Sequence, residues 1–554
     1  MKKRKPINWF KFGFILLFPV LVGSLLWIYG MMNSLINYRS PLASTPPLPG
    51  EKIGSPITRK VIIVLMDALR VDTSTDSSVM PFLNHLRSLG SFATMTSRPP
   101  TSSSPAYGTM LTGAWPDLND TQVLNPQGGE SARPYTQDDI FAAAHRAGLK
   151  TAVSSYIWFN QVLLNDHVDE VYSTNIENHE VDHQEVDAAL PWVEQGYQLV
   201  MIHLDQIDYA GHHEGGPRSP NWNAAANRVD FLLQEIVTHM NLEKDTIIVL
   251  SDHGQIDAGG HGGTEKVVRT EPFVIAGAGI LKGVTSEIQM ADVAPTLAVL
   301  LGTSIPASNQ GRPLLEFLDL PENEYAVIQD RVNVQQELLL STYTQAIDWK
   351  SQISSTGIDT ASPEREMELA RLGRLGNERV WRNVLAVFLA ILPGYLIFMN
   401  RNNKILWPVL GAVVYLGTFN LYFLLLEQKS YSISWINGEA SFLGTMATAV
   451  GIAVIIGWIM VMWGQKGFHL KPRLVAYRTL GFIWMVIYLV SIPILLNFAI
   501  NGITITWTLP VFPIFTLGFL SLAQLLFIIP VGLLLMGIGS LISLVSSSPT
   551  IRKR

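Results

Sequence analysis

Apolar residues gather in six long runs, which separate a membrane part from a large polar interval. The first run, Phe12–Met32, holds 21 residues without a charge. Five more lie towards the C-terminus: Val384–Met399, Ile405–Leu426, Phe442–Trp463, Leu480–Ala499 and Val511–Val545. Because about 20 apolar residues cover the hydrocarbon core of a bilayer, each run predicts a transmembrane helix, the second by starting at Val380. The last run contains two prolines, so it is either one kinked helix or a span followed by a re-entrant segment.

The first run predicts an uncleaved membrane anchor. A secretory signal has an apolar core of only about 7–15 residues, which this run exceeds. The small residues at Pro41–Thr45 keep a cleaved signal as the alternative.

Basic residues predict the orientation of the six spans, because they are enriched in cytoplasmic loops. They lie before the first span, after the second, after the fourth and at the chain's end: Lys2, Lys3, Arg4, Lys5 and Lys11; Arg401 and Lys404; Lys466, Lys471, Arg473 and Arg478; and Arg552–Arg554. Six spans put these segments and both termini on the cytoplasmic side of the plasma membrane or an equivalent membrane. The predicted organisation is a cytoplasmic tip and anchor (1–32), a Pro-rich linker (33–58), an extracytoplasmic domain (59–320), a helical stalk (321–379) and a five-span domain (380–554).

The composition agrees with a membrane protein and excludes several other classes. Charged residues make up 15% of the chain and the net charge is −6, whereas soluble domains carry about 25% charged residues. This balance argues against a nucleic-acid partner. The chain has no cysteine, which excludes disulfide scaffolds, thiolate zinc sites and cysteine nucleophiles.

The polar interval alternates apolar strand-like runs with helix-like stretches. The runs are Val61–Met66, Lys150–Ser154, Leu199–Leu204, Thr246–Ser251 and Pro272–Ala276, and the helical stretches include Pro81–Leu89, Asp138–Ala147 and Asn223–Met240. Fully apolar strands of this kind predict an α/β fold with a mainly parallel sheet covered by helices on both faces. In such sheets ligands bind beyond the carboxyl ends of the strands.

Acidic and histidine residues follow three of the predicted strands. Asp67 follows the first, Asp208 and His212 follow the third, and Asp252 and His253 follow the fourth, with His261 in a glycine-rich stretch just beyond. A single Asp at a strand end is commonly a turn or a helix cap, but six such residues at one edge suit two metal ions with about three protein ligands each. Nitrogen and oxygen ligands favour zinc, with manganese as the alternative. The glycines around His261 also fit close approach of the backbone to a ligand.

A row of hydroxyls supplies the candidate nucleophile. Thr101 to Ser104 stand just before a helix-like run, where the helix N-terminus would favour a phosphate. Simple N-capping is the alternative role for these side chains.

The ordered motifs resemble the alkaline phosphatase superfamily. Within it they are most similar to the GPI ethanolamine phosphate transferases and the type I phosphodiesterase/nucleotide pyrophosphatases. The matching segments are Val61–Arg70, the hydroxyl row, Asp208–His212, Ser251–Gly254, Gly260–Gly263 and Asp292–Gly302. The resemblance covers about residues 59–315 and implies an alkaline-phosphatase-like catalytic domain.

The resemblance also implies roles for individual residues. One metal ion would take Asp67, Asp252, His253 and the nucleophile, and the other would take Asp208, His212 and His261. In relatives the nucleophile stands two residues before a Pro, so Pro105 selects Ser103, with Ser102 and Thr101 as the next choices. Tyr107 stands where sulfatases of this fold carry an Arg, which disfavours a sulfatase.

The implied function is transfer of phosphoethanolamine or a similar headgroup. Ser103 would attack a phosphodiester, and a glycan or lipid acceptor would resolve the phospho-serine; a phospholipid is the expected donor because the spans hold the site at a membrane. One alternative is a membrane-tethered phosphodiesterase or phosphatase that uses water. Another is a non-catalytic membrane protein with a decayed site, which the six filled ligand positions disfavour.

Overall fold

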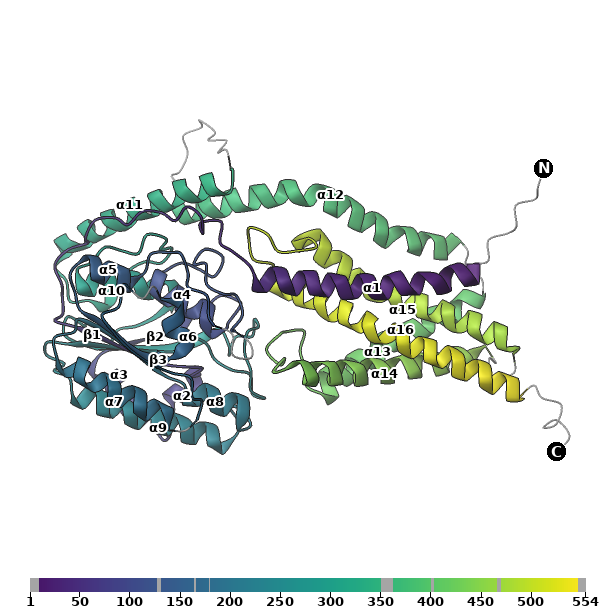
Figure 1. Ribbon diagram of the computed structural model, residues 1–554, viewed down its shortest axis with the longest axis horizontal. Coiled ribbons are helices and arrows are strands. Elements are labelled where there is room, and N and C mark those ends of the chain that lie inside the picture. The colour runs from purple at the N-terminus through teal and green to yellow at the C-terminus, as the bar shows by residue number, and fades with distance from the viewer. Residues whose placement is uncertain are drawn as a thin grey trace.

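The computed structural model describes residues 9–126, 131–163, 166–178, 180–349, 362–399, 403–465 and 470–546. An α/β domain lies at one end of the molecule and a bundle of long helices at the other (Figure 1). The first residues of α1 (Trp9–Ile36) and the last residues of α16 (Phe512–Ser546) lie at the end of the bundle that is remote from the α/β domain (Figure 1).

Within the described residues, eight strands form one sheet in the order β4-β3-β5-β1-β6-β7-β2-β8. They are β1 (Val61–Met66), β2 (Ser91–Thr96), β3 (Thr151–Tyr156), β4 (Glu170–Thr174), β5 (Leu199–Leu204), β6 (Thr246–Leu250), β7 (Thr270–Gly277) and β8 (Thr285–Gln289). β7 is antiparallel to both of its neighbours, and the other described pairings are parallel. The predicted mainly parallel sheet is confirmed, with β7 as the exception.

Helices cover both faces of this sheet. They are α2 (Val71–Thr75), α3 (Pro81–Leu89), α4 (Ser103–Thr112), α5 (Ile140–Arg146), α6 (Ile157–Val162), α7 (Val181–Glu194), α8 (Gln206–His213), α9 (Pro220–Thr238) and α10 (Val293–Leu301). Odd-numbered residues of β1, such as Ile63, belong to a core with α4, α5 and α10, and even-numbered residues, such as Val64, belong to a second core with α3, α7 and α9. Side chains alternate along a strand, so the unbroken apolar sequence of β1 is what two covered faces require (Figure 1).

The described residues include six helices that are long and apolar enough to cross a membrane, and the chain is an integral membrane protein. The candidate spans are α1, α12 (Pro363–Met399), α13 (Asn403–Asn420) with its π-helical continuation η3 (Leu421–Leu426), α14 (Glu439–Gly464), α15 (Pro472–Asn501) and α16. The predicted number of spans is confirmed. The last apolar run is a single 35-residue helix rather than a span with a re-entrant segment.

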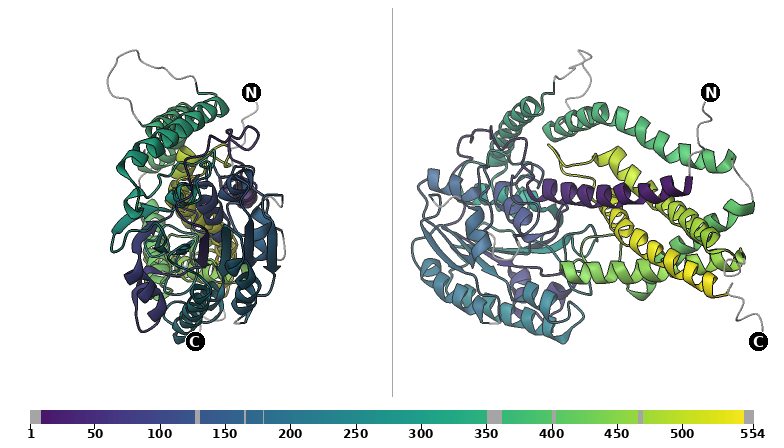
Figure 2. Two further views of the ribbon diagram at one scale, coloured as in Figure 1. Left: turned by 90° about the vertical axis from the view of Figure 1, so that its left-hand side faces the viewer. Right: turned by 45° about the vertical axis from the view of Figure 1, so that its right-hand side comes forward.

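Two helices connect the α/β domain to the bundle. α11 (Glu322–Ala346) packs against α12, and α12 runs as one helix of 37 residues into the bundle. The predicted limit between stalk and span, at residue 379, therefore falls inside an unbroken helix. Figure 2 shows α12 passing from the α/β domain along the bundle.

The α/β domain packs directly on the membrane part. Val123 of the α/β domain belongs to the apolar cluster of the bundle, and Leu124 and Ile256 pack against that cluster. The Tyr38 hydroxyl lies 2.9 Å from the Asp117 carbonyl oxygen and 3.2 Å from that of Trp507, in the loop between α15 and α16. The carboxyl edge of the sheet is thereby held close to the bundle.

Candidate metal and phosphoryl-transfer site

Three neighbouring parallel strands carry most of the site. β5, β1 and β6 lie side by side, so the residues that follow them meet at one edge of the sheet. Asp67 follows β1, Asp208 and His212 lie on α8 after β5, and Asp252 and His253 follow β6. This juxtaposition follows directly from the strand order.

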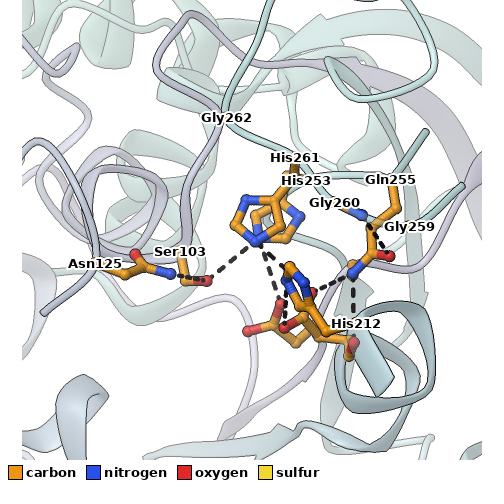
Figure 3. A network of polar contacts seen from close by, with 12 residues as sticks. Ser103, Asn125, His212, His253, Gln255, Gly259, Gly260, His261 and Gly262 are labelled. Atoms are coloured by element: carbon orange, nitrogen blue, oxygen red, sulfur yellow. Dashed lines mark hydrogen bonds and ion pairs between the residues drawn. The ribbon is translucent and has the colours of Figure 1, made fainter. Parts of the chain in front are cut away.

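The first group of side chains surrounds Ser103. Its Oγ lies 3.2 Å from His253 Nε2 (Figure 3). The same imidazole nitrogen lies 3.5 Å from Asp67 Oδ1 and 3.4 Å from Asp252 Oδ2. The structure thus brings together the four residues that the resemblance assigned to one metal ion.

The second group is formed by Asp208, His212 and His261. Their candidate ligand atoms all lie within 4.8 Å of one another. The ring centroids of His212 and His261 are 5.0 Å apart, and the His261 ring stacks on that of His253 at 3.8 Å. The two groups are therefore adjacent (Figure 3).

The donor set fits divalent cations. Asp67 Oδ1 and Asp252 Oδ2 are buried carboxylate oxygens without a hydrogen-bond partner among the described residues, and a buried charge left unpaired is costly. Burial, reinforced by Asp252 and Asp208, raises the pKa of Asp67 well above its usual value. Burial acts in the same direction on Asp208, but His212 and His261 outweigh it and bring the pKa of that carboxyl to about 2. A bound cation would offset the repulsion among these carboxylates.

Backbone carbonyls fix the tautomers of the two stacked histidines. His261 Nδ1 lies 2.9 Å from the Thr101 carbonyl oxygen, and His253 Nδ1 lies 3.2 Å from that of Gly254. A carbonyl only accepts, so each Nδ1 carries the proton and each Nε2 keeps its lone pair. This is the usual arrangement of a metal-binding imidazole.

Close packing explains two glycines of the motifs. A Cβ on Gly211, between Asp208 and His212, would stand 1.8 Å from Gln255 Oε1, and the Gln255 amide donates to Asp208 Oδ1. A Cβ on Gly254, after His253, would stand 2.1 Å from the Val267 carbonyl oxygen. Both positions exclude any side chain.

Of the four hydroxyls, Ser103 is the one that contacts His253. It is the first residue of α4, and Ser102 precedes it without a side-chain capping bond. The Thr101 hydroxyl instead donates to the Gly263 carbonyl and accepts from the Gly262 N–H. The Ser104 hydroxyl is buried without a hydrogen-bond partner among the described residues.

Three residues of the site escaped the sequence analysis. The Tyr107 hydroxyl donates to Asp67 Oδ2 at 2.8 Å, and His203 Nε2 lies 2.9 Å from the same oxygen. The Tyr156 N–H points at His203 Nδ1, so His203 carries its proton on Nε2 and donates to Asp67. Burial lowers the pKa of His203 to about 3, which keeps the ring neutral. The sequence signal that could have revealed His203 is its position as a histidine inside an otherwise apolar strand.

The third of these residues is Asn125, which lies beside the candidate nucleophile. Its amide donates to Ser103 Oγ at 3.2 Å, and its carbonyl oxygen accepts from the Ser104 N–H at 3.1 Å (Figure 3). Asn125 stands 22 residues after Ser103, in a loop with no periodic pattern, so spacing alone gave no signal.

A loop of the membrane part closes the site from the other side. We call residues 427–438, between η3 and α14, the membrane loop. Its Ser434 hydroxyl accepts from the Gly263 N–H at 2.9 Å and donates to Glu265 Oε2 at 2.8 Å, and its Asn437 amide donates to the Gly259 carbonyl. The membrane loop thus holds the segment that carries His261.

Two of the glycines around His261 pack against the membrane loop. A Cβ on Gly260 would stand 2.2 Å from the Ser434 carbonyl oxygen, and a Cβ on Gly263 would stand 1.9 Å from the Ser432 hydroxyl. These two glycines make room for the membrane loop. The α/β domain and the membrane part are complementary at the site itself.

The fold and the acid–histidine site define a mainly parallel α/β domain with a candidate two-metal site at the carboxyl edge of its sheet. Residues 61–299 match the family model of type I phosphodiesterase / nucleotide pyrophosphatase. The α/β domain is thus similar to this family, and the resemblance seen in the sequence is confirmed.

Curated relatives add a second likeness. The chain is 26% identical over 336 residues to GPI ethanolamine phosphate transferase 2 of Candida albicans, covering 55% of this chain and 37% of that protein. It is 26% identical over 322 residues to the catalytic subunit of human GPI ethanolamine phosphate transferase 2, covering 50% and 32%. The chain thus spans about a third of the length of these relatives.

Solved structures show lower similarity. Human ectonucleotide pyrophosphatase/phosphodiesterase 5 is 14% identical with a TM-score of 0.38, covering 47% of this chain and all of that one. The wild-type alkaline phosphatase PafA is 12% identical with a TM-score of 0.36, covering 48% and all of that chain.

Proposed function

We propose that this chain is a membrane-bound phosphotransferase that moves phosphoethanolamine, or a similar headgroup, from a phospholipid to a hydroxyl of a glycan or lipid acceptor. The observation that carries the proposal is the position of Ser103. Its hydroxyl lies at the start of α4, 3.2 Å from His253 Nε2 and beside the unpartnered oxygens of Asp67 and Asp252. The names of the curated relatives support phosphoethanolamine as the transferred group.

Two divalent ions, zinc before manganese, are proposed as cofactors. One ion would be held by Asp67, Asp252, His253 and Ser103. The other would be held by Asp208, His212 and His261. When bound, the ions would supply positive charge that stabilises the attacking and leaving oxygens of a phosphoryl transfer.

The residues of the chain account for two displacement steps. In the first, Ser103 Oγ gives up its proton and bonds to phosphorus, while the bond from phosphorus to the diacylglycerol oxygen breaks and that oxygen takes up a proton. In the second, the acceptor hydroxyl bonds to phosphorus and the bond to Ser103 breaks, which restores the serine. The Asn125 amide and the Ser103 N–H, at the start of α4, would hold the phosphoryl oxygens.

The site would work outside the cytoplasm, at the membrane surface. The basic residues favour this orientation, and the contacts of the membrane loop with Gly259, Gly263 and Glu265 put the site next to the bundle. A lipid headgroup can then reach Ser103 without leaving the bilayer, which favours a phospholipid donor over a soluble nucleotide.

Trapping of the covalent intermediate tests the proposal. The full chain, loaded with zinc, is mixed with phosphatidylethanolamine, quenched in acid and digested, and the peptide carrying Ser103 is analysed by mass spectrometry. We expect phosphoethanolamine on Ser103 and its loss in Ser103→Ala. This variant should keep the fold, because losing one buried, hydrogen-bonded hydroxyl costs about 1–3 kcal/mol, less than the usual stability of a domain. Ser102→Ala and Ser104→Ala are the matched controls and should keep the adduct.

The outcomes separate the alternatives. Adduct on Ser102 or Thr101 in the Ser103→Ala protein would contradict the assigned nucleophile. Release of free phosphoethanolamine at the same rate with and without glycan acceptors would identify a hydrolase. Neither adduct nor turnover in the zinc-loaded protein, with any acceptor, would support a non-catalytic membrane protein.

A further inference from the structure

A cavity of about 300 Å³ lies between α12 and the loop that joins α15 to α16. It is separate from the acid–histidine site, and none of the metal-site residues lines it. Three arginines, Arg371, Arg379 and Arg382, line it together with a single carboxylate, Glu378. The described lining therefore has an excess of two positive charges.

Arg382 is the arginine of this cavity whose surroundings indicate a bound anion. Its side chain is only 9% exposed, and its guanidinium nitrogen Nη2 has no hydrogen-bond partner among the described residues. The nearest carboxylate oxygen, Glu378 Oε2, lies 3.6 Å away. Nη1 faces Gly502 so closely that a Cβ there would stand 2.6 Å from it. A buried guanidinium with a free donor calls for an anionic partner.

The other charges of the cavity are already engaged. Arg371 makes a bidentate pair with Glu368, and Arg379 donates to the Ile500 carbonyl at the end of α15. Glu378 accepts from the Trp507 indole at 2.9 Å and from Arg374 at 3.3 Å. Glu378 is thus shared among several donors, and its ion pair with Arg382, at 3.6 Å, is longer than its bonds to Trp507 and Arg374.

The position of the cavity indicates a lipid rather than a soluble anion. Arg382 stands two residues before the apolar run Val384–Met399, so it lies at the edge of the predicted hydrocarbon layer. The rim is apolar and exposed: Trp381 is 58% exposed and Ile503 53%. Tryptophan is typical of the interface between membrane and water. Arginines inside the cavity and apolar residues at its rim match a lipid, whose charged headgroup is joined to acyl chains.

We propose that this cavity binds the headgroup of an anionic phospholipid in the leaflet nearer the α/β domain. The guanidinium of Arg382 would donate to a phosphate oxygen, as arginine commonly does. The excess of positive charge favours a headgroup with net negative charge, such as phosphatidylglycerol, over a zwitterionic one. This site is independent of the proposed transferase activity and of its metal ions.

Native mass spectrometry of the full chain in detergent tests the proposal. The protein is titrated with phosphatidylglycerol, with phosphatidylcholine and with glycerophosphoglycerol, the headgroup without acyl chains. We expect tighter binding of phosphatidylglycerol than of phosphatidylcholine and no retention of the soluble headgroup. Arg382→Gln should weaken phosphatidylglycerol binding about tenfold, the size expected for one hydrogen bond to a charged group.

Arg365→Gln is the matched control, because it removes one exposed arginine from the same helix, about 25 Å away along its axis. It should bind phosphatidylglycerol like the wild type. Should Arg382→Gln fail to fold, Thr506→Trp fills the cavity while keeping every charge, and it too should lose the lipid. Equal binding by all folded variants, or equal binding of the soluble headgroup, would overturn the proposal.

Discussion

At the scale of single residues, hydrogen bonds orient the Asp67 carboxylate within the site. Tyr107 and His203 both donate to Oδ2, which leaves Oδ1 as the oxygen that points at His253 and has no described hydrogen-bond partner. Residues that orient metal ligands in this way commonly affect metal affinity by 10–100-fold. The two donors would therefore be part of the proposed metal site, although neither is assigned as a ligand.

Tyr107→Phe tests that role. It removes one donor to Asp67 and the contact of the same hydroxyl with His203 Nε2, so we expect metal affinity to fall by about tenfold or more, measured by competition with a chelator. Tyr135→Phe is the control, because Tyr135 is also buried and donates to a carboxylate, Asp139, away from the site. Equal chelator sensitivity of the two variants would show that the Tyr107 hydroxyl has only a structural role.

Asn125→Ala tests the amide beside the nucleophile. Loss of one donor to a developing negative charge lowers turnover by about 10²–10³-fold in comparable sites, and we expect a decrease of that order in the rate of phosphoethanolamine transfer. The metal content should stay unchanged, because Asn125 contacts Ser103 and Ser104 rather than the carboxylates. Asn84→Ala, in α3 of the same domain, should transfer at the wild-type rate.

At the scale of elements, the sequence predicted the centre of the sheet better than its margins. β1, β5 and β6 are wholly buried and wholly or nearly apolar, and each was found within a residue of its observed ends. β4 and β8 lie at the edges, where half or more of their residues are exposed, and β2 lies beside β8. All three were missed, because a polar face leaves no continuous apolar run to recognise.

The same limit applies to the site. Asp67 and Asp252 directly follow central strands, so the order of the chain reveals them. Tyr107 belongs to a buried helix, where an aromatic side chain is an ordinary core residue. The membrane loop is about 170 residues from His261 in sequence, as the Gly263–Ser434 bond shows. Contacts across such a separation depend on how two parts of the molecule dock, which no local pattern encodes.

Ser434→Ala tests that docking. The change leaves the Gly263 N–H and Glu265 Oε2 without their described hydroxyl partner, at a cost of about 1–3 kcal/mol. Because the loss falls on the segment of His261, we expect faster release of one of two metal ions to a chelator. Ser491→Ala removes a hydroxyl inside α15 and should release both ions as the wild type does; the same release from both variants would rule out a role of the membrane loop at the site.

At the scale of the whole molecule, the predicted topology remains to be tested. Buried residues of the α/β domain, such as Gln137 and Asn309, are unsuitable for labelling, and Asn402 and the C-terminus lie outside the described residues. Exposed positions serve better: Lys282 in the α/β domain and Lys471 at the start of α15.

Single cysteines at these two positions give an unambiguous readout, because the native chain has none. An impermeant maleimide on intact cells should label Lys282→Cys and leave Lys471→Cys unlabelled until the cells are opened. The two carry the same substitution and differ only in the side of the membrane. Labelling of Lys471→Cys in intact cells would reverse the orientation and place the proposed site in the cytoplasm.

Because α12 is unbroken, it fixes the distance of the α/β domain from the bilayer. Its 37 residues span about 55 Å, and its first turns pack against the α/β domain through Met367 and Ala370. One inserted residue would move that domain by about 1.5 Å along the helix axis and rotate it by about 100° about that axis. The height of the domain above the membrane and its orientation are therefore coupled. Under the proposed transferase function, we expect this fixed height to limit the acceptors to those whose hydroxyl reaches the level of Ser103 above the bilayer.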